Sequence, residues 1–461
     1  MPRDPASALR VVNPYDLKVV AEIPWDSPAA VDDKLDRART AHRRWQALSL
    51  EKRTVEITRS LEYFRKNSAK VARDITLQMG KPIAQAMREV DTMLARAQHL
   101  LVIAKYALAH ETLPAPTGTT FRIEHRPHGV VLDIAAWNYP LLVPVNVVVP
   151  ALVAGNAVLL KHSPLTPLCG LHFAHAFAAL SIPDVVQSLV LENERTEKLI
   201  EDARIDHVSF TGSVATGRKV YAAAARRLID AGLELGGKDP AYVAEDADLE
   251  FAAENVVDGA CYNAGQSCCA VERVYVHESL YKPFLERARS FVKAYRMGDP
   301  LEEKTTLGPL ARPEAIETLE RQVEDALKRG AKELYRGKRP FGRGTFFEPT
   351  LLSGVPNDAL VMQEESFGPI VPVASVANDE EAIARMNDSR YGLSASVWTR
   401  STERAERIAR DLEAGTVYKN RCDFLDPALP WTGWKESGIG STLSRYGFLA
   451  LTKRRSIHFR G

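Results

Sequence analysis

Two adjacent thiols lie in a short run of small and polar residues, Asn263-Ala264-Gly265-Gln266-Ser267-Cys268-Cys269. On a tight turn at a helix end, backbone N–H groups favour the thiolate, which is the nucleophilic form of cysteine. The alternative is that Cys268 and Cys269 are small buried hydrophobic residues, the usual state of free cysteines. A metal site is not expected, because adjacent cysteines lack ligand spacing and the chain has no Cys-x-x-Cys.

A carboxylate and an amide also stand where strands are expected to end. Glu234, in Leu233-Glu234-Leu235-Gly236-Gly237-Lys238, is flanked by apolar residues, and burial raises a carboxyl pKa towards the range of a general base. A buried glutamate paired with a cation would give the same pattern. Asn138, in Trp137-Asn138-Tyr139-Pro140, could donate to a developing oxyanion or could simply form a turn.

The signals for phosphate binding are weaker. No Gly-x-Gly-x-x-Gly follows a predicted strand, so the usual dinucleotide fingerprint is missing. The run Phe210-Thr211-Gly212-Ser213 lies between a predicted strand and a helix, where Gly212 and Ser213 could hold a phosphate at the helix amino terminus. A plain N-cap role for Ser213 explains the same residues.

These residues need elements to position them, and from Val130 onward short apolar strands alternate with helices. The expected strands are Val130–Ile134, Ala157–Leu160, Val186–Leu191, His207–Phe210 and Gly232–Leu235. The expected helices between them are Leu141–Ala154, Pro167–Leu180, Thr196–Asp202 and Val214–Arg226. Such alternation predicts a parallel sheet covered on both faces, with ligands at the carboxyl ends of the strands.

Further elements flank this unit. Helical spacing is expected before it, over Ala29–Leu48, Glu51–Gln78 and Lys81–His110, and Thr119–His125 alternates like one half of a hairpin. A second unit begins near Gly237. Its expected elements are the helices Leu249–Ala264 and Leu280–Tyr295, the strands Val274–His277 and Ile370–Val376, and a terminal strand Ser456–Arg460.

Composition sets outer limits on the function. With 461 residues the chain is long enough for two or three domains, and its net charge of +1 favours neither nucleic acid nor an acidic membrane surface. Five cysteines in so long a chain imply reduced thiols, and the start, Met1-Pro2-Arg3-Asp4-Pro5, lacks the apolar core of a signal peptide, so a cytoplasmic protein is expected. The apolar stretch Gly129–Leu160 contains Asp133 and three prolines, which fits strand, helix and strand better than a membrane span.

No single motif decides the function, but their order along the chain resembles the aldehyde dehydrogenase superfamily. The run Asn-x-Gly-Gln-x-Cys ends at Cys268, and Glu-Leu-Gly-Gly-Lys begins 34 residues earlier at Glu234. The other family signatures are Trp137-Asn138, Ala154-Gly155-Asn156 to Lys161, Phe210-Thr211-Gly212-Ser213, Glu364-Glu365-Ser366-Phe367-Gly368-Pro369 and Ser437-Gly438. The resemblance covers nearly the whole chain.

The resemblance implies an α/β fold of three parts. Residues 1–111 and 128–236 would form a Rossmann-like cofactor domain, and 237–435 an α/β catalytic domain. Residues 112–127 and 436–461 would form a small β extension that pairs subunits in a homodimer or homotetramer. No nucleic acid or membrane partner is implied.

The resemblance also assigns roles in the oxidation of an aldehyde to a carboxylic acid with NAD or NADP. Cys268 would attack the aldehyde, Asn138 and the Cys268 backbone N–H would stabilise the oxyanion, and Glu234 would activate the water that hydrolyses the thioester. The cofactor-binding residues implied are Trp137, Lys161 (ribose), Gly212 and Ser213 (pyrophosphate), Leu235, Glu365 and Phe367. The substrate channel implied is lined by Tyr139, Asn146, Tyr262, Asp423, Leu425 and Trp431.

The sequence departs from the family at the cofactor. A glutamate usually follows the cofactor lysine by three positions, but Pro164 stands there in Lys161-His162-Ser163-Pro164. An acidic residue repels a 2′-phosphate, so its absence predicts that NADP is tolerated and that NAD binds more weakly than usual. The Lys161-His162 pair is similar to a branch that includes bacterial succinate-semialdehyde dehydrogenases, which suggests a semialdehyde substrate.

The sequence departs again near the general base and in the channel. Val147 and Thr442 replace a Lys–Glu pair that relays protons in many relatives, so Glu234 is expected to exchange protons by another route. Three channel aromatics suggest an apolar or aromatic aldehyde. Arg421 could instead meet the carboxylate of a semialdehyde, although a solvated surface arginine is the more usual case.

Four alternative functions stay open at this point. One is a broad-specificity aliphatic or aromatic aldehyde dehydrogenase, and a second is a CoA-acylating dehydrogenase, in which the glutamate base tends to be absent. A third is a non-catalytic structural or binding protein, against which the intact Cys268, Glu234 and Asn138 argue. The fourth is a cysteine hydrolase, which would need a histidine partner for the thiol.

Overall fold

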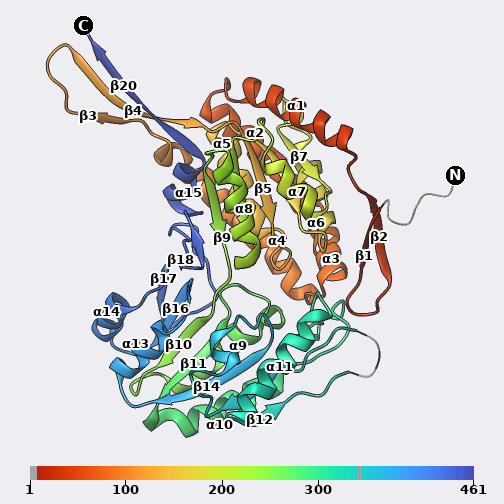
Figure 1. Cartoon of the computed structure of the whole chain (residues 1–461), viewed down its shortest axis with the longest axis vertical. Coiled ribbons are helices and arrows are strands. Elements are labelled where there is room, and N and C mark those ends of the chain that lie inside the picture. Colours follow the sequence, from red (N-terminus) through yellow and green to blue (C-terminus); the bar gives the residue numbers. More distant parts are fainter. Residues whose placement is uncertain (1–7, 341, 343) are drawn as a thin grey trace.

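The chain folds around two sheets that lie at opposite ends of the molecule, with a thin β extension projecting from one of them (Figure 1). The structure is a computed structural model, and it describes residues 8–340, 342 and 344–461. Both sheets are mainly parallel and are packed with helices, so the predicted α/β class is confirmed.

The first sheet has six strands in the order β19-β9-β8-β5-β6-β7. They are β5 (Val130–Ala135), β6 (Ala157–His162), β7 (Val186–Leu189), β8 (His207–Thr211), β9 (Ala231–Glu234) and β19 (Gly438–Ile439). The first five are parallel, and β19 pairs antiparallel with β9. Every residue of β5, β6 and β7 is buried, which explains the unbroken apolar runs in the sequence.

Helices cover both faces of this sheet. They are α1 (Pro28–Trp45), α2 (Leu50–Lys66), α3 (Ser68–Met79), α4 (Ile83–Ala107), α5 (Leu142–Ala154), α6 (Pro167–Phe177), α7 (Asn193–Ile200), α8 (Val214–Arg226) and α15 (Ser444–Ala450). Helices α2 to α6 share an apolar core with β5 and β6, while parts of α1, α7 and α8 pack on the opposite face. The strands predicted here are confirmed to within a few residues at each end.

One predicted helix in this region is wrong. The pattern Glu51–Gln78 is two helices, because Asn67 leaves the helical conformation between α2 and α3. Its side-chain amide donates to the Tyr63 carbonyl at 2.8 Å and so caps the last turn of α2. Asparagine side chains compete with the helix ladder in this way, a local effect that apolar periodicity does not report.

The second sheet has seven strands in the order β12-β13-β14-β11-β10-β16-β17. They are β10 (Asp239–Val243), β11 (Val271–His277), β12 (Lys332–Arg336), β13 (Thr350–Ser353), β14 (Ile370–Val376), β16 (Ser394–Trp398) and β17 (Thr416–Lys419). Only the edge strand β12 is antiparallel to its neighbour. The sequence predicted β11 and β14 but not the other five, whose short runs carry no clear alternation.

Its helices are α9 (Leu249–Cys261), the short 3₁₀ turn η2 (Tyr262–Gly265), α10 (Glu278–Ala294), α11 (Glu314–Lys328), α12 (Leu360–Gln363), α13 (Asp379–Asn387) and α14 (Thr402–Asp411). Two small strands, β15 (Tyr391–Gly392) and β18 (Trp434–Lys435), pair near the boundary between the two sheets. A hairpin of β1 (Ala8–Val12) and β2 (Val19–Pro24) lies along the outer edge.

The extension contains β3 (Glu111–Leu113), β4 (Thr119–Pro127) and β20 (Thr452–Arg460), in the order β20-β4-β3. The predicted hairpin half at Thr119–His125 lies in β4 and pairs with β3. β4 also pairs with every residue of the predicted terminal strand Ser456–Arg460. Gly129–Leu160, the apolar stretch, is β5, α5 and β6. Within the described residues, no helix is long and apolar enough to cross a membrane.

Candidate active site

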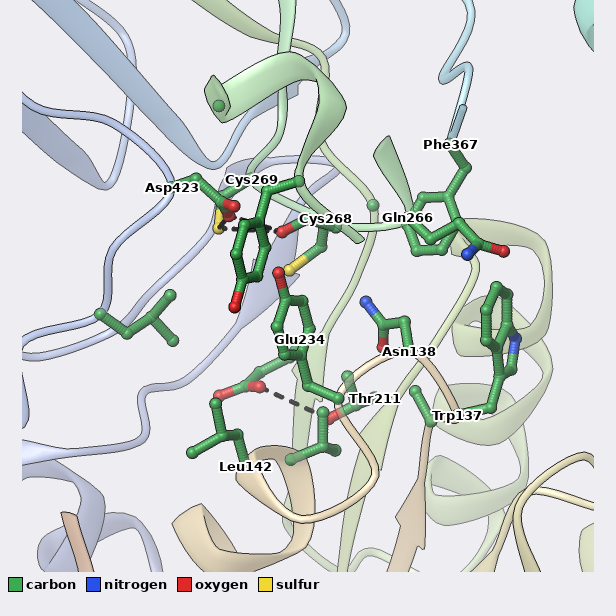
Figure 2. A pocket seen from close by; sticks show the side chains of 18 of the residues that line it. Trp137, Asn138, Leu142, Thr211, Glu234, Gln266, Cys268, Cys269, Phe367 and Asp423 are labelled. Carbon is green, nitrogen blue, oxygen red and sulfur yellow. Dashed lines mark hydrogen bonds between the residues drawn. The ribbon is translucent and has the colours of Figure 1, made fainter. Parts of the chain in front are cut away.

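A cavity of about 510 Å³ opens between the two sheets, at the carboxyl ends of β5, β8 and β9. This is the place where parallel sheets bind ligands. Every predicted site residue except Lys161 lines this cavity: Cys268, Glu234, Asn138, Trp137, Gly212, Ser213, Leu235, Glu365, Phe367, Tyr139, Asn146, Tyr262, Asp423, Leu425 and Trp431. Figure 2 shows Cys268, Glu234 and Asn138 around one space, with Trp137 and Phe367 at one side of it.

Cys268 lies on a tight turn between η2 and β11. The predicted helix Leu249–Ala264 is wrong at its end, because α9 stops at Cys261 and Asn263 and Ala264 take left-handed φ values of 53° and 56°. The turn therefore follows the carboxyl end of a helix. It does not lie at a helix amino terminus, where free backbone N–H groups would favour a thiolate at Cys268.

The same turn distinguishes the two thiols. Cys268 is partly exposed, whereas Cys269 is buried with 2% of its surface exposed. The hydrogen bond with Cys268 and burial raise the pKa of the Cys269 thiol well above its usual range. Cys269 also donates to the Asp423 carboxylate at 3.1 Å. Cys268 is thus the thiol that a substrate in the cavity can reach.

Asn263 ties this turn to the loop that carries Asn138. Its side-chain amide donates to the carbonyl of Asn138 at 3.0 Å and to the carbonyl of Gln266 at 3.1 Å. The unusual backbone of η2 is what brings this amide to both carbonyls. Asn263 therefore connects the cysteine turn to the loop of Asn138.

A buried ion pair holds the Asn138 loop from the other side. Lys81 and Glu89 form a salt bridge, and both side chains are almost entirely buried. The Lys81 ammonium donates to the Asn138 carbonyl at 2.9 Å, and Glu89 accepts from the Leu141 backbone N–H at 2.8 Å. The sequence reading missed both residues, although a charge at Glu89 among the buried positions Ala86 and Val90 of α4 is a signal that could have revealed the pair.

Glu234 ends β9 and faces the cavity. Burial raises the pKa of its carboxyl above the ordinary value, and three neighbours reduce this rise: the Thr442 hydroxyl, the Arg96 charge and the Thr211 hydroxyl. Thr442 donates to Oε1, and Thr211 donates to Oε2 at 3.4 Å. A carboxyl with a raised pKa beside a thiol is suited to act as a general base near neutral pH.

Thr442 stands at the position where the resemblance implied the loss of the acidic partner of a proton relay. It does not leave a gap, because its hydroxyl reaches Glu234 directly. Two backbone hydrogen bonds with Trp431, at 2.9 and 3.0 Å, hold Thr442 there. Val147, at the other relay position, is buried in the apolar core of α5.

The channel residue Asp423 is bound to the thiol turn. Its carboxylate accepts from the Ser267 hydroxyl at 2.6 Å as well as from Cys269, as the dashed lines of Figure 2 indicate. Burial raises the pKa of Asp423 to about 6. It therefore helps to hold the turn of Cys268 besides lining the channel.

Another buried pair shapes the side of the cavity near Phe367. Lys238 and Glu272 form a salt bridge at 2.6 Å, and Glu272 accepts from the backbone N–H groups of Ser366 and Phe367 at 2.7 and 2.8 Å. Phe367, with φ of 55°, then packs edge-on against Trp137 at 5.6 Å between ring centres. Sequence reasoning missed Glu272, which stands in the apolar run of β11.

Glu365 and the glycines of the Glu234 motif meet at this side. Glu365 accepts from the Gly237 N–H at 3.1 Å, and burial raises its pKa to about 7. A Cβ at position 237 would overlap the carbonyl oxygen of Cys268, so only glycine fits there. The second glycine of Glu-Leu-Gly-Gly-Lys thus allows the close approach of the cysteine turn to the strand end.

Gly212 and Ser213 lead from β8 into α8. The Ser213 side chain accepts from the Thr216 N–H at 3.4 Å and caps the helix. The N-cap alternative for Ser213 is therefore confirmed, and it is compatible with phosphate binding because the first turn of α8 begins at the edge of the cavity.

Lys161 lies outside the main cavity, near the carboxyl end of β6. Its ammonium donates to the Asn193 amide oxygen at 2.9 Å, and burial lowers its pKa to about 8. In the part of the chain that the structure describes, burial alone shifts this pKa, and no carboxylate offsets it. Pro164 follows in the turn after β6.

Two arginines near the site lie in contrasting positions. Arg421 is exposed, does not line the cavity, and stacks over the Phe424 ring at 3.3 Å, so the surface alternative is the one that the structure supports. Arg96, on α4, does line the cavity, but the sequence reading missed it because it lies within an ordinary mixed helical pattern.

Residues 2–457 match the model of the Aldehyde dehydrogenase family. Among similar proteins, an aldehyde dehydrogenase of Paenarthrobacter nicotinovorans is 38% identical over 91% of this chain and 93% of its own length. A succinate-semialdehyde dehydrogenase [NADP(+)] of Deinococcus radiodurans is 35% identical over 98% and 95%. The solved structure of lactaldehyde dehydrogenase from Escherichia coli superposes with a TM-score of 0.95, at 31% identity, over 100% of this chain and 97% of that one.

Proposed function

The chain belongs to the aldehyde dehydrogenase family, and on that premise we propose that it oxidises an aldehyde to a carboxylic acid through a thioester on Cys268. One observation carries the proposal: the accessible thiol of Cys268, the carboxyl of Glu234 and the amide of Asn138 share a single cavity. The enzyme is an NAD(P)-dependent oxidoreductase.

The residues around the cavity fit a nicotinamide cofactor. Trp137, Leu235, Glu365 and Phe367 form one wall beside Cys268, and the capped amino terminus of α8 offers free N–H groups at the same edge. Backbone N–H groups at a helix amino terminus match a pyrophosphate. We assign Gly212 and Ser213 to this contact and Lys161 to the ribose on the adenosine side.

The chain's own residues account for the two halves of the reaction. The Cys268 thiol releases its proton to solvent, the thiolate sulfur attacks the aldehyde carbon, and the carbonyl oxygen becomes an oxyanion that the Asn138 amide and the Cys268 N–H stabilise. When bound, the nicotinamide accepts the hydride that leaves this carbon, which leaves a thioester. Glu234 then takes a proton from a water molecule, the water oxygen attacks the thioester, and the carboxylic acid and the free thiol are released.

Two substitutions test these roles. Cys268→Ser is expected to abolish formation of reduced cofactor with any aldehyde. Glu234→Gln is expected to keep a first burst of reduced cofactor, equal to one per active site, and to lose turnover by about 100-fold or more. A Cys268→Ser enzyme that still turns over would refute the thioester route.

The presence of Glu234 also argues against the CoA-acylating alternative. Glu234 supports hydrolysis by water, because an acyl group transferred to CoA needs no such base. Turnover of the unmodified enzyme that depends on added CoA would reverse this assignment.

We propose further that the enzyme accepts NADP at least as well as NAD. Pro164 stands where a ribose-binding glutamate is usual, and Lys161 has no carboxylate partner among the described residues. A similar protein is named for NADP(+). Pro164→Glu is expected to raise the KM for NADP about tenfold and lower that for NAD, and strict NAD selectivity of the unmodified enzyme would contradict the proposal.

A semialdehyde is the substrate class that we propose, with a broader aliphatic or aromatic aldehyde as the alternative. Several similar proteins are named succinate-semialdehyde dehydrogenases, while another is named lactaldehyde dehydrogenase. The aromatic channel side chains, Tyr139, Tyr262 and Trp431, would suit the alternative. Rates with succinate semialdehyde, benzaldehyde and long alkanals separate the two.

The β3-β4-β20 extension supports a homodimer or homotetramer. It projects away from the body, and it exposes Leu113 and Phe459, at 44% and 61% of their surface (Figure 1). We assign 112–127 and, of 436–461, the strand β20 to assembly, since β19 and α15 pack with the first sheet. We assign 1–111 and 128–236 to cofactor binding, and 237–435 to catalysis. Light scattering of the whole chain and of a chain ending at Leu451 tests the assembly role, because only the truncated chain should be a monomer.

We propose a cytoplasmic location because of the state of the five cysteines. All five, Cys169, Cys261, Cys268, Cys269 and Cys422, are free, as expected in a reducing compartment. Fractionation of the cells that produce the protein tests this location.

A further inference from the structure

One buried cation in the cavity, Arg96, forms no salt bridge with the residues that the structure describes. Arg96 extends from α4 into the cavity wall, and only 5% of its surface is exposed. Its Nη1 donates to the Asn146 amide oxygen at 3.1 Å and to the Leu142 carbonyl at 3.4 Å, and its Nη2 donates to the Leu425 carbonyl at 3.4 Å. All three acceptors are neutral oxygens, and two of the bonds are long.

The guanidinium is therefore undersatisfied. It has five N–H donors, and Nε is buried without an acceptor. Within the described residues, its hydrogen bonds go to one side-chain amide and two backbone carbonyls, and none goes to a carboxylate. Burial lowers the pKa of Arg96 to about 10, so it is still a cation at neutral pH. An unpaired buried charge costs several kcal/mol, which implies that a partner arrives from outside the chain.

The nearby carboxylates are already occupied. Glu89 pairs with Lys81, Asp423 accepts from Ser267 and Cys269, and Asp258 accepts from the Tyr295 hydroxyl at 2.9 Å. Among the charged groups around Arg96, Glu234 does most to raise the pKa of the guanidinium. Its two carboxylate oxygens accept hydrogen bonds from the hydroxyls of Thr442 and Thr211. The oxygens of these carboxylates are thus bound by other donors, and the hydrogen bonds of the Arg96 guanidinium go to neutral oxygens alone.

We propose that Arg96 binds the carboxylate of the substrate, so that the enzyme selects a short aldehyde with a carboxylate at its far end. The inference rests on the proposed function and names the residue that sets its specificity. Arginine holds a carboxylate through two parallel, charge-assisted hydrogen bonds, and those bonds satisfy donors that the protein leaves free. Leu142 and Leu425, beside the guanidinium, offer apolar surface to the intervening methylene groups.

Succinate semialdehyde and butanal form a matched pair for the test, because a methyl group replaces the carboxylate on an otherwise equal carbon chain. The unmodified enzyme is expected to have the higher kcat/KM with succinate semialdehyde. In Arg96→Met, the ratio of the two kcat/KM values should fall about 100-fold or more, mainly through the KM for succinate semialdehyde. Arg96→Lys, which keeps the charge but not the planar fork, should give an intermediate ratio.

Two further arginines are matched controls. Arg421→Met alters an exposed residue outside the cavity and should leave the ratio unchanged. Arg88 also lines the cavity, but its side chain is exposed to solvent. Arg88→Met therefore tests whether this exposed arginine, and not the buried Arg96, selects substrates that carry a carboxylate. A fall in the ratio for Arg88→Met that exceeds the fall for Arg96→Met would overturn the proposal.

The remaining outcomes are equally distinct. With butanal as substrate, succinate should inhibit the unmodified enzyme competitively and should inhibit Arg96→Met at least about tenfold more weakly. Equal losses of kcat/KM for both aldehydes would show that Arg96 only positions Glu234 or the channel wall, and this proposal would fail. No reduced cofactor with either aldehyde in the unmodified enzyme would instead refute the proposed function.

Discussion

Removal of the Thr442 hydroxyl tests how Glu234 works without the relay pair of its relatives. In Thr442→Val, Oε1 of Glu234 loses its hydrogen-bond donor while the shape of the side chain is nearly kept. That hydroxyl stabilises the carboxylate, so its loss raises the pKa of Glu234 further above the ordinary value.

The size of the effect follows from the bond that is lost. A hydrogen bond to a charged group contributes about 1.5–3 kcal/mol, and about 1.4 kcal/mol corresponds to a tenfold change in a protonation equilibrium. Below the pH at which Glu234 titrates, the fraction of active carboxylate should therefore fall roughly tenfold or more. At alkaline pH the carboxylate forms in both enzymes, and the two rates should converge.

The assay separates the two halves of the reaction. The burst of reduced cofactor reports the steps through thioester formation, and the slower linear phase includes hydrolysis. Thr442→Val should lower the linear phase on the acidic side of the pH profile and leave the burst amplitude unchanged. Its matched control is Thr211→Val, which removes a bond of 3.4 Å and should have a much smaller effect.

Two results would refute this reasoning. One is a pH–rate profile of Thr442→Val whose acidic side is not shifted from that of the unmodified enzyme. This result would mean that the hydroxyl does not stabilise the carboxylate. The other is an equal shift in Thr211→Val, because the geometry assigns most of the stabilisation to Thr442.

Three other expectations follow from the same structure. Burial lowers the pKa of Lys161 to about 8, so its positive charge is lost as the pH rises through that value. Between pH 7 and 9 the KM for NADP should therefore rise more than the KM for NAD. Parallel changes in the two KM values would contradict the role of Lys161 in cofactor binding. Lys81→Met leaves Glu89 buried without its cation, so it should destabilise the protein by about 3–5 kcal/mol in urea unfolding, and an unchanged midpoint would be inconsistent with the buried pair. Gly237→Ala introduces a Cβ against the Cys268 carbonyl, so kcat should fall by about 100-fold in a protein that keeps its circular dichroism, and wild-type kcat would disprove the close approach.

Much of the fold was predictable because its signals are local. Unbroken apolar runs such as β5 and β6 identify strands buried on both faces, and the alternation with helices identifies a parallel sheet. The second sheet was largely missed, because the short strands β10, β13, β16 and β17 lack a clear period. The break at Asn67 was missed for another reason, since a single side-chain cap divides one continuous helical pattern.

The chemical groups of the site were also predictable from sequence, through the ordered motifs around Asn138, Glu234 and Cys268. The supporting groups were not. Glu89, Glu272 and Arg96 are charged residues in patterns typical of ordinary helices and strands, and nothing local shows that their partners are Lys81, Lys238 and a cavity.

The sequence alone thus identified Asn138, Glu234 and Cys268 as the candidates for the chemistry, because the order of their motifs along the chain resembles one family. Only the tertiary structure decided how that thiol is presented. It placed the turn after the carboxyl end of α9, it left Cys268 accessible and Cys269 buried, and it brought Thr442 against Glu234. The physical reason is that Thr442 and Glu234 are 208 residues apart in the chain, so their contact depends on strand order and packing and not on any local pattern.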